Sequence, residues 1–388
     1  MAYSSRNIKE LSADVEYKDN SLFKSYGKYL EEFEEGATFE HPRGMTVSAG
    51  LLHDFATTYL ESNPLYLNEK YAKSLGYASL PASPLLTMNI ILSLGVQNNS
   101  EKAYANLGYY DMHFLRPVYA GDTLRAFSRV AERRDRGEGK PGIITLNTLG
   151  LNQRGEEVIQ YTRKIMVPQQ PEGYKAPQAV KSDQAITALP DSVPLEIPQF
   201  NTKDWPANFT RPDTYYEDFE VGQVIASPNG RTITDEHFGW TYKVGNTHPL
   251  HFDAMYSKGQ SGAMSGDPIV YGGLVFAWLL GLASRDTSEN ALYDLGYTEG
   301  YHTQPAKSGD TVYVISRVLA KEPVDSSLGA GAIQFQVIGL KNMKPQDAIE
   351  QNGADLFIKE NNKKKLGKEK IATKIFEIER RLLIRSRA

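Results

Sequence analysis

The sequence lacks cysteine, an excess of one charge, and long hydrophobic runs. None of its 388 residues is cysteine, which excludes a disulfide framework, a thiol nucleophile and thiolate metal ligands. Its 43 Lys and Arg side chains nearly balance 47 Asp and Glu side chains, which argues against a general nucleic-acid or membrane-surface binder. The longest apolar runs, 85–96 and 272–283, are about half as long as a membrane span. The first residues also lack the apolar centre of a secretory signal. We therefore expect a cytoplasmic protein with no membrane or nucleic-acid partner.

An internal repeat organises the chain. Residues 29–48 align with 215–234 at 8 identities in 20 positions, and residues 106–130 align with 294–318 at 10 in 25. Further matching blocks occur in the same order at nearly the same offset. Self-similarity at a long period means that one structural unit is repeated. The chain is therefore expected to contain two copies of one domain.

The copies are separated by a proline-rich stretch. We place the first domain at 22–170, the linker at 171–208 and the second domain at 209–388, because prolines cluster in the linker without an apolar period. The second copy carries an additional lysine-rich stretch at about 343–372. The lysine run within this stretch predicts a solvated loop.

Each copy follows the same order of elements. A short strand and a capped helix start lead to one long apolar helix, at 83–99 and at 272–286. Alternating apolar residues then predict strands, with hairpin turns expected at 120–123 and 308–311. This pattern predicts an α+β unit in which an antiparallel sheet wraps the helix. Since such a sheet leaves an exposed edge, we expect the two copies to pair edge to edge.

The two copies differ most in one short segment. The second copy reads Gly-Asn-Thr-His-Pro-Leu-His-Phe-Asp at 245–253, where the first reads Leu-Glu-Ser-Asn-Pro-Leu-Tyr-Leu-Asn at 60–68. Two imidazoles, a carboxamide and a carboxylate are thus concentrated in the second copy. The first copy has Glu61 and Tyr66 at matching places. We interpret these two residues as relics in a half that shapes the site without performing its chemistry.

The segment 245–253 resembles the signature of the MaoC-like (R)-specific enoyl-CoA hydratases, and is most similar to that of their mesaconyl-CoA (2-methylfumaryl-CoA) hydratase branch. The stretches 105–124 and 142–167 are similar to the same branch. The likeness covers about 25–170 and 209–342. It implies a double hotdog fold and reversible hydration of an α,β-unsaturated acyl-CoA thioester, with mesaconyl-CoA or β-methylmalyl-CoA as the branch's substrates.

Hydration of an enoyl thioester needs a base for water and donors for the developing enolate oxygen. His251 suits the role of base, because an imidazole exchanges protons near neutral pH. Tyr271, Gly272 and Gly273 precede the long apolar helix, where backbone N–H groups can bind the thioester oxygen. Asn246 stands where the wider family has a catalytic Asp. We expect it to orient water, which leaves His251 either working alone or assisted by another carboxylate.

Two further residues of this segment are candidates for substrate binding. His248 could contact the substrate or only orient the loop, and Asp253 could contact the substrate or cap the loop. Asp253 and Glu61 are also the candidates for the assisting carboxylate. His-x-x-His alone does not make a metal site, because no third ligand has suitable spacing.

The function classes left open are few. We expect no metal or redox cofactor, and CoA enters as part of the substrate. The family resemblance favours a hydro-lyase that forms a homodimer, although the residues leave the oligomeric state open. A hotdog acyl-CoA thioesterase and a non-catalytic acyl-CoA-binding protein remain alternatives, the latter because Asn246 replaces the family's acid.

Overall fold

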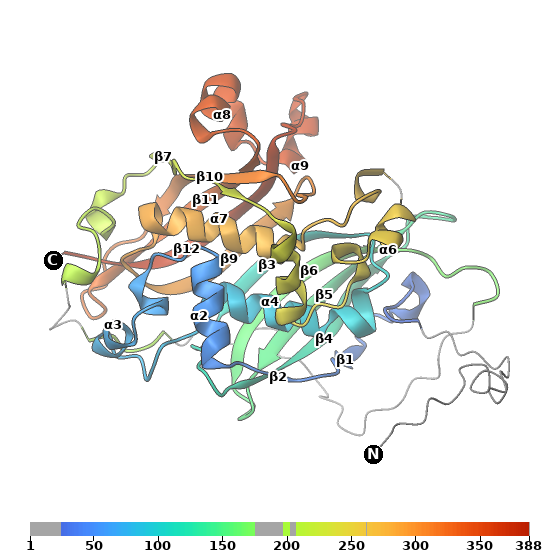
Figure 1. Cartoon of the computed structure of the whole chain (residues 1–388), viewed down its shortest axis with the longest axis horizontal. Helices are drawn as coiled ribbons and strands as arrows, with labels where there is room; N and C mark the ends of the chain where they lie inside the picture. The colour runs from blue at the N-terminus through green and yellow to red at the C-terminus, as the bar shows by residue number, and fades with distance from the viewer. Residues whose placement is uncertain (1–24, 175–196, 202–206, 261, 388) are drawn as a thin grey trace, which may run out of the picture.

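The computed structural model describes residues 25–174, 197–201, 207–260 and 262–387. Its strands form one 12-stranded sheet in the order β1-β4-β5-β6-β3-β9-β12-β11-β10-β7, with β2 paired to β4 and β8 to β10. The strand pairs are antiparallel. Figure 1 shows the long helices α4 and α7 in front of this sheet.

The first half consists of a strand-and-helix lead-in, a central helix and four long strands. Its elements are β1 (Thr38–Glu40), β2 (Met45–Thr46), α2 (Ala49–Thr58), α3 (Glu69–Ser74), α4 (Pro84–Leu94), β3 (Ala105–Phe114), β4 (Thr123–Arg134), β5 (Gly142–Leu151) and β6 (Glu157–Val167). A short π-helix, η3 (Val96–Ser100), follows α4. The helix predicted at 83–99 is therefore confirmed.

The second half repeats this plan and adds two helices. Its elements are β7 (Val224–Ala226), β8 (Arg231–Thr232), α5 (Trp240–Lys243), η7 (Pro249–His251), α6 (Ala254–Lys258), α7 (Gly272–Thr287), β9 (Ala291–His302), β10 (Thr311–Lys321), β11 (Ala330–Lys341), α8 (Pro345–Asn352), α9 (Glu360–Lys363) and β12 (Lys374–Arg385). The helix predicted at 272–286 is likewise confirmed.

The halves join through their strand edges, as expected. β3 pairs with β9 in the register Tyr109↔Gly300 and Met112↔Tyr297, so the two sheets become one and neither inner edge is left open. Helices α4 and α7 also contact each other. Asn89 of α4 donates from Nδ2 to the Gly273 carbonyl of α7 (3.2 Å). The start of α7 is thereby fixed against the first half.

Both central helices are apolar around most of their circumference, because strands and the partner helix surround them. All residues of α4 except Pro84, and most of α7, are buried, as expected for a helix enclosed by other elements. The apolar phase predicted in the strands is also present: Ile159, Tyr161 and Val167 of β6 are buried.

Two local predictions are wrong. The turns at 120–123 and 308–311 are not hairpins between neighbouring strands, because β3 and β4 are separated in the sheet, as are β9 and β10. Gly121 and Asp122 instead exchange backbone hydrogen bonds with Val47. Turn residues determine only the local backbone conformation, whereas the order of the strands in the sheet is set by packing over the whole half.

The second wrong prediction concerns the lysine run of the segment 343–372, for which a solvated loop was expected. Most of these lysines are exposed, but the segment folds into helices and Lys363 is buried. Ala348 and Leu356 are buried against Ile338 of β11, and Lys363 is buried in an ion pair with Glu360 (2.8 Å). Figure 1 shows α8 projecting beyond the rest of the molecule. A few apolar side chains anchor this insertion despite its many lysines.

Most of the predicted linker lies outside the described residues, so the boundaries 22–170, 171–208 and 209–388 stay predictions. Within the described residues, no helix combines the length and apolar character needed to cross a membrane.

Candidate active site

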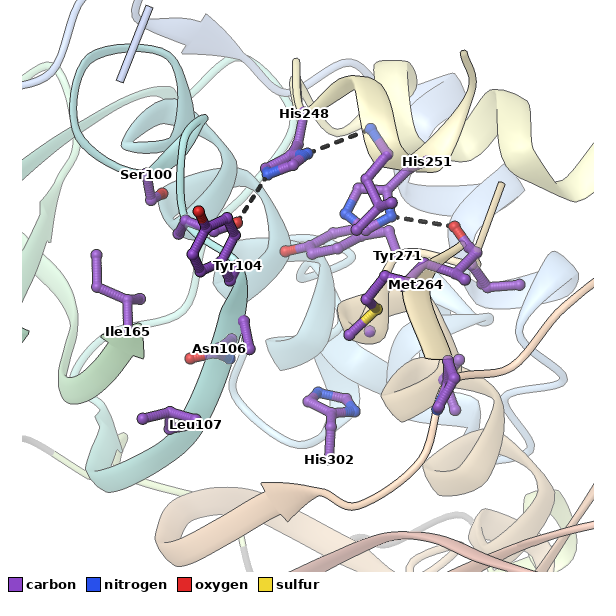
Figure 2. A pocket seen from close by; sticks show the side chains of 18 of the residues that line it. Ser100, Tyr104, Asn106, Leu107, Ile165, His248, His251, Met264, Tyr271 and His302 are labelled. Atoms are coloured by element: carbon purple, nitrogen blue, oxygen red, sulfur yellow. Dashed lines mark hydrogen bonds between the residues drawn. The ribbon is translucent and has the colours of Figure 1, made fainter. Parts of the chain in front are cut away.

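A cavity of about 310 Å³ lies where the two halves meet. Figure 2 shows side chains of both halves facing each other across it. The first half contributes Ser100, Tyr104, Asn106, Leu107 and Ile165, among others. The second half contributes, among others, Asn246, His248, His251, Met264, Tyr271, Gly272 and His302. The cavity thus contains most of the predicted site residues.

His251 lies at the end of the 3-10 turn η7, which begins with Pro249. Its Nδ1 lies 3.1 Å from the Ile269 carbonyl. Since a carbonyl only accepts, Nδ1 carries the proton and Nε2 keeps its lone pair. Burial, followed by the neighbouring His248, lowers the pKa of His251 to about 3. The imidazole is therefore neutral at pH 7 and has one nitrogen able to accept a proton.

His248 is held by hydrogen bonds at both nitrogens. Nε2 donates to the Ala103 carbonyl in the first half (3.2 Å), and Nδ1 accepts from the Leu250 N–H (3.2 Å). Burial lowers its pKa to about 4. The ring lines the cavity with neither nitrogen left for proton transfer. This geometry favours the loop-orienting interpretation, in which His248 ties the catalytic loop to the opposite half.

Asn246 is buried and also lines the cavity. Its Oδ1 accepts a hydrogen bond from the His248 N–H (2.9 Å). This hydrogen bond fixes the orientation of the amide group. The backbone N–H of Asn246 donates to the Thr241 carbonyl (2.9 Å). An amide at the cavity wall can orient water but cannot take its proton.

The start of α7 supplies free backbone donors. The first hydrogen bonds into this helix come from the N–H groups of Leu274 and Val275, which both donate to the Tyr271 carbonyl. The N–H groups of Gly272 and Gly273 therefore lie in the first turn, which has no intrahelical acceptors. Gly272 lines the cavity, and a Cβ there would lie 2.7 Å from the His302 ring.

Gly273 and Tyr271 have packing roles beside this turn. A Cβ on Gly273 would lie 1.9 Å from Asn89 Oδ1, so only glycine fits against α4 there. The Tyr271 ring packs 5.4 Å from that of His251 between centroids. Its hydroxyl is buried near that of Ser93, and neither meets hydrogen-bond geometry with any described residue. Burial raises the Tyr271 pKa well above 10, so the phenol stays a neutral donor.

The structure does not bring the two candidate carboxylates to the cavity. Asp253 is exposed and caps α6, accepting from the N–H groups of Met255 (2.8 Å) and Tyr256 (3.0 Å). Glu61 accepts from the N–H groups of Ser62 and Asn63 on the far side of the pseudo-twofold axis. Among the described residues, no Asp or Glu lines the cavity. His251 is therefore left without an assisting carboxylate.

Sequence reasoning missed three residues of the cavity. Tyr109 and His302 form one hydrogen-bonded pair, with the Tyr109 hydroxyl 3.1 Å from His302 Nε2. Burial lowers the pKa of His302 to about 4. Arg163 of β6 is buried and brings a fixed positive charge to the lining. The repeat held a signal for His302, since Phe114 stands at the matching place of the first copy.

A metal site finds no support in the described part of the chain, where no three His, Cys, Asp or Glu side chains cluster suitably. The rings of His248 and His251 are 5.5 Å apart between centroids. Both nitrogens of His248 and Nδ1 of His251 face the hydrogen-bond partners given above.

Comparison with known proteins shows the family of this chain. A family model described as mesaconyl-CoA hydratase matches residues 17–348. The chain belongs to the mesaconyl-CoA hydratase family. A β-methylmalyl-CoA dehydratase of Chloroflexus aurantiacus is 31% identical over 83% of this chain and 90% of its own length. A mesaconyl-CoA hydratase of Cereibacter sphaeroides is 30% identical over 81% and 90%.

Solved structures confirm the fold of this family member. A putative MaoC domain dehydratase from Chloroflexus aurantiacus superposes with a TM-score of 0.80 at 28% identity, covering 95% of this chain and all of the other. A Mycobacterium tuberculosis protein described as having a double hotdog fold superposes with a TM-score of 0.70 at 19% identity, covering 92% and 98%. The resemblance drawn from the sequence and the predicted double hotdog are thereby confirmed.

The matching region on the other side of the joined halves is filled by side chains. Tyr66 and Glu61 of the first half lie there, beside voids of about 10 and 30 Å³. A buried ion pair of the second half also occupies this region, since Arg380 contacts Asp294 through Nε (2.9 Å) and Nη2 (2.8 Å). The Tyr297 hydroxyl donates to the same carboxylate (3.1 Å). In the described residues, the two halves of this mesaconyl-CoA hydratase family member thus form an open site, at the cavity, and a closed site, filled by these side chains.

Proposed function

We propose that this chain catalyses the reversible addition of water to mesaconyl-CoA, giving β-methylmalyl-CoA. Its family is one of acyl-CoA hydratases and dehydratases. The observation that carries the proposal is the neutral His251, whose free Nε2 lies in a cavity beside the open N-terminal turn of α7. This arrangement supplies a base and an oxyanion site in one place.

In the proposed reaction, the N–H of Gly272 binds the thioester oxygen, and the positive end of the α7 dipole favours the enolate charge that develops there. His251 Nε2 takes a proton from water while the water oxygen bonds to the β-carbon. The imidazolium then gives that proton to the α-carbon. The atoms of one water are added across the double bond, and His251 returns to its neutral form.

His251 acts alone as base and acid in this scheme, because the described cavity lining contains no carboxylate. Its low pKa makes the imidazolium short-lived, which favours rapid return of the proton to the α-carbon. Asn246 Nδ2 and the Tyr271 hydroxyl remain as neutral donors that can hold the attacking water.

The test is a small panel of enoyl-CoA thioesters, including mesaconyl-CoA and crotonyl-CoA, followed by absorbance of the conjugated thioester. Free thiol is assayed in parallel. We expect loss of conjugation without thiol for mesaconyl-CoA. Thiol release would instead make the protein a thioesterase, and binding of CoA esters without turnover would make it an acyl-CoA-binding protein.

We further propose that the reaction needs no metal or redox cofactor and that the protein is a cytoplasmic homodimer. Dialysis against a chelator should leave the hydration rate unchanged. Light scattering of the purified protein measures its mass in solution, and a mass of one chain would contradict the dimer.

A further inference from the structure

Arg163 is a buried cation, and the residue is only 3% exposed. Nη2 donates to the neutral oxygens Asn99 Oδ1 (3.3 Å) and Ser100 Oγ (3.0 Å), while Nε is buried and has no hydrogen-bond partner among the described residues. No ion pair connects this guanidinium to a carboxylate in the parts of the chain that the structure describes. A buried charge left in this state is costly unless a counter-charge arrives.

The second half shows what an arginine does at the equivalent position. Arg163 faces Tyr109 across β6 and β3, and Arg380 faces Tyr297 across β12 and β9. Tyr109 and Tyr297 are matching residues of the repeat. The two arginines therefore occupy one position of the fold.

The halves differ in the partner of this arginine. Asp294 provides the carboxylate that binds Arg380 through Nε and Nη2. The matching residue of the first half is Asn106, which faces Ile165 just as Asp294 faces Leu382. Exchange of a carboxylate for an amide leaves Arg163 unpaired. Asn106 also lines the cavity, and its Oδ1 is buried near the Tyr109 hydroxyl without meeting hydrogen-bond geometry with any described residue.

We propose that Arg163 binds the distal carboxylate of the acyl group, so that the site selects CoA thioesters of dicarboxylic acids. The substrate carboxylate takes the place that Asp294 occupies in the other half, and Asn106 donates to it from its amide. This inference rests on the proposed function and assigns its specificity to one residue.

The arrangement of the cavity supports this assignment. His251 and the start of α7 lie on the wall formed by the second half, while Arg163 and Asn106 belong to strands of the first half. An acyl chain with its thioester oxygen at Gly272 and its β-carbon at His251 places a carboxylate on that β-carbon toward the opposite wall. Among the described residues of the lining, Arg163 alone bears a fixed charge.

The first test compares mesaconyl-CoA with (E)-2-methylbut-2-enoyl-CoA, which has a methyl group in place of the carboxylate. In Arg163→Met, we expect the ratio of kcat/KM between the charged and neutral substrates to fall about 100-fold, as for loss of a buried charge-assisted contact. Equal losses on both substrates would assign Arg163 a structural role and overturn the proposal. Arg380→Met is the matched control, and the ratio should stay at the wild-type value.

A second variant recreates the closed arrangement and guards against misfolding of Arg163→Met. Asn106→Asp supplies an internal carboxylate to Arg163, so the variant should be at least as stable as wild type to heat. Its kcat/KM for mesaconyl-CoA should fall about 100-fold relative to the neutral substrate. Unchanged preference in the folded Asn106→Asp protein would overturn the proposal.

Binding of saturated analogues separates the two proposals. Wild type should bind methylsuccinyl-CoA more tightly than 2-methylbutyryl-CoA in calorimetry, and Arg163→Met should lose that preference. If wild type hydrates mesaconyl-CoA but Arg163→Met keeps the preference, only the role of Arg163 fails. If wild type hydrates neither substrate, the proposed function itself fails.

Discussion

The two halves of the chain have one fold, but together they form two different sites. In the open site, His251 and Gly272 of the second half and Arg163 of the first half line a cavity of about 310 Å³. In the closed site, the matching places hold Tyr66 and Pro84 of the first half and Arg380 of the second half, and side chains fill the space. The first residue of α4 is Pro84, which has no N–H to offer an oxyanion.

This difference indicates that the two matching sites of a repeated fold can have different roles, one catalytic and one structural. The closed site has Tyr66 and Pro84 where the open site has a base and a backbone donor, and an internal carboxylate neutralises its arginine. The first half still contributes to the open site, because β3, η3 and α4 form one wall of the cavity. The following predictions test this division.

The largest expected effect is on turnover. His251→Ala should lower kcat for mesaconyl-CoA by about 10³-fold, because the proposed reaction depends on its imidazole for both proton transfers. Tyr66→Phe, at the matching place of the closed site, should retain most of the activity. Both rates are measured by loss of the conjugated thioester absorbance, and similar losses in the two variants would show that the halves share the chemistry.

The closed site should be more sensitive in stability. Asp294→Asn leaves Arg380 buried beside a neutral amide, so it should lower the free energy of unfolding by about 3 kcal/mol. Denaturant titration followed by fluorescence measures this change. Glu322→Gln is the control, because it breaks an exposed pair with Arg381 (2.6 Å) and should cost less than about 1 kcal/mol. Equal effects would mean that the buried pair does not stabilise the closed site.

The helix starts should also respond differently. A Cβ at Gly272 would lie 2.7 Å from the His302 ring, so Gly272→Ala should displace that ring and lower kcat/KM by about 10-fold. Pro84→Ala, at the start of α4, should change kcat/KM by less than about 2-fold. A larger effect at Pro84 than at Gly272 would place the oxyanion site in the wrong half.

The smallest effect concerns pH and stability. Burial lowers the pKa of His302 to about 4, below the value of about 6.5 for an unfolded chain. Between these values the unfolded state binds more protons, so the contribution of His302 is complete above pH 6.5 and is lost as the pH falls toward 4. The melting temperature of His302→Gln should therefore fall less steeply than that of wild type between pH 7 and 4.5. Parallel slopes would contradict the buried neutral imidazole.

Much of the fold was predictable because the repeat and the apolar periods act over long segments. The central helices and the edge-to-edge joint followed from these patterns. The insertion at 343–372 did not, since five buried apolar side chains decide its packing among many charged ones: Ala348, Leu356, Ile315, Ile338 and Leu340. The turns at 120–123 and 308–311 were misassigned because turn residues do not reveal which strands pair.

The site was predictable only where residue types are distinctive. His251, Asn246, Tyr271 and Gly272 line the cavity as expected. Arg163 was missed because a single arginine in a strand forms no recognisable motif. Its role is indicated only by comparison with Arg380 at the matching position of the other half. A full comparison of the two copies would have marked it indirectly, since Asn106 and Asp294 differ within an aligned block.

The most direct test of the division between halves is the number of substrate sites per chain. Calorimetric titration of the purified protein with methylsuccinyl-CoA, which cannot be hydrated, gives this number. The account predicts one site per 388-residue chain, with its affinity reduced in Arg163→Met and unchanged in Tyr66→Phe. Two sites per chain, or one site weakened by the Tyr66 change, would contradict it.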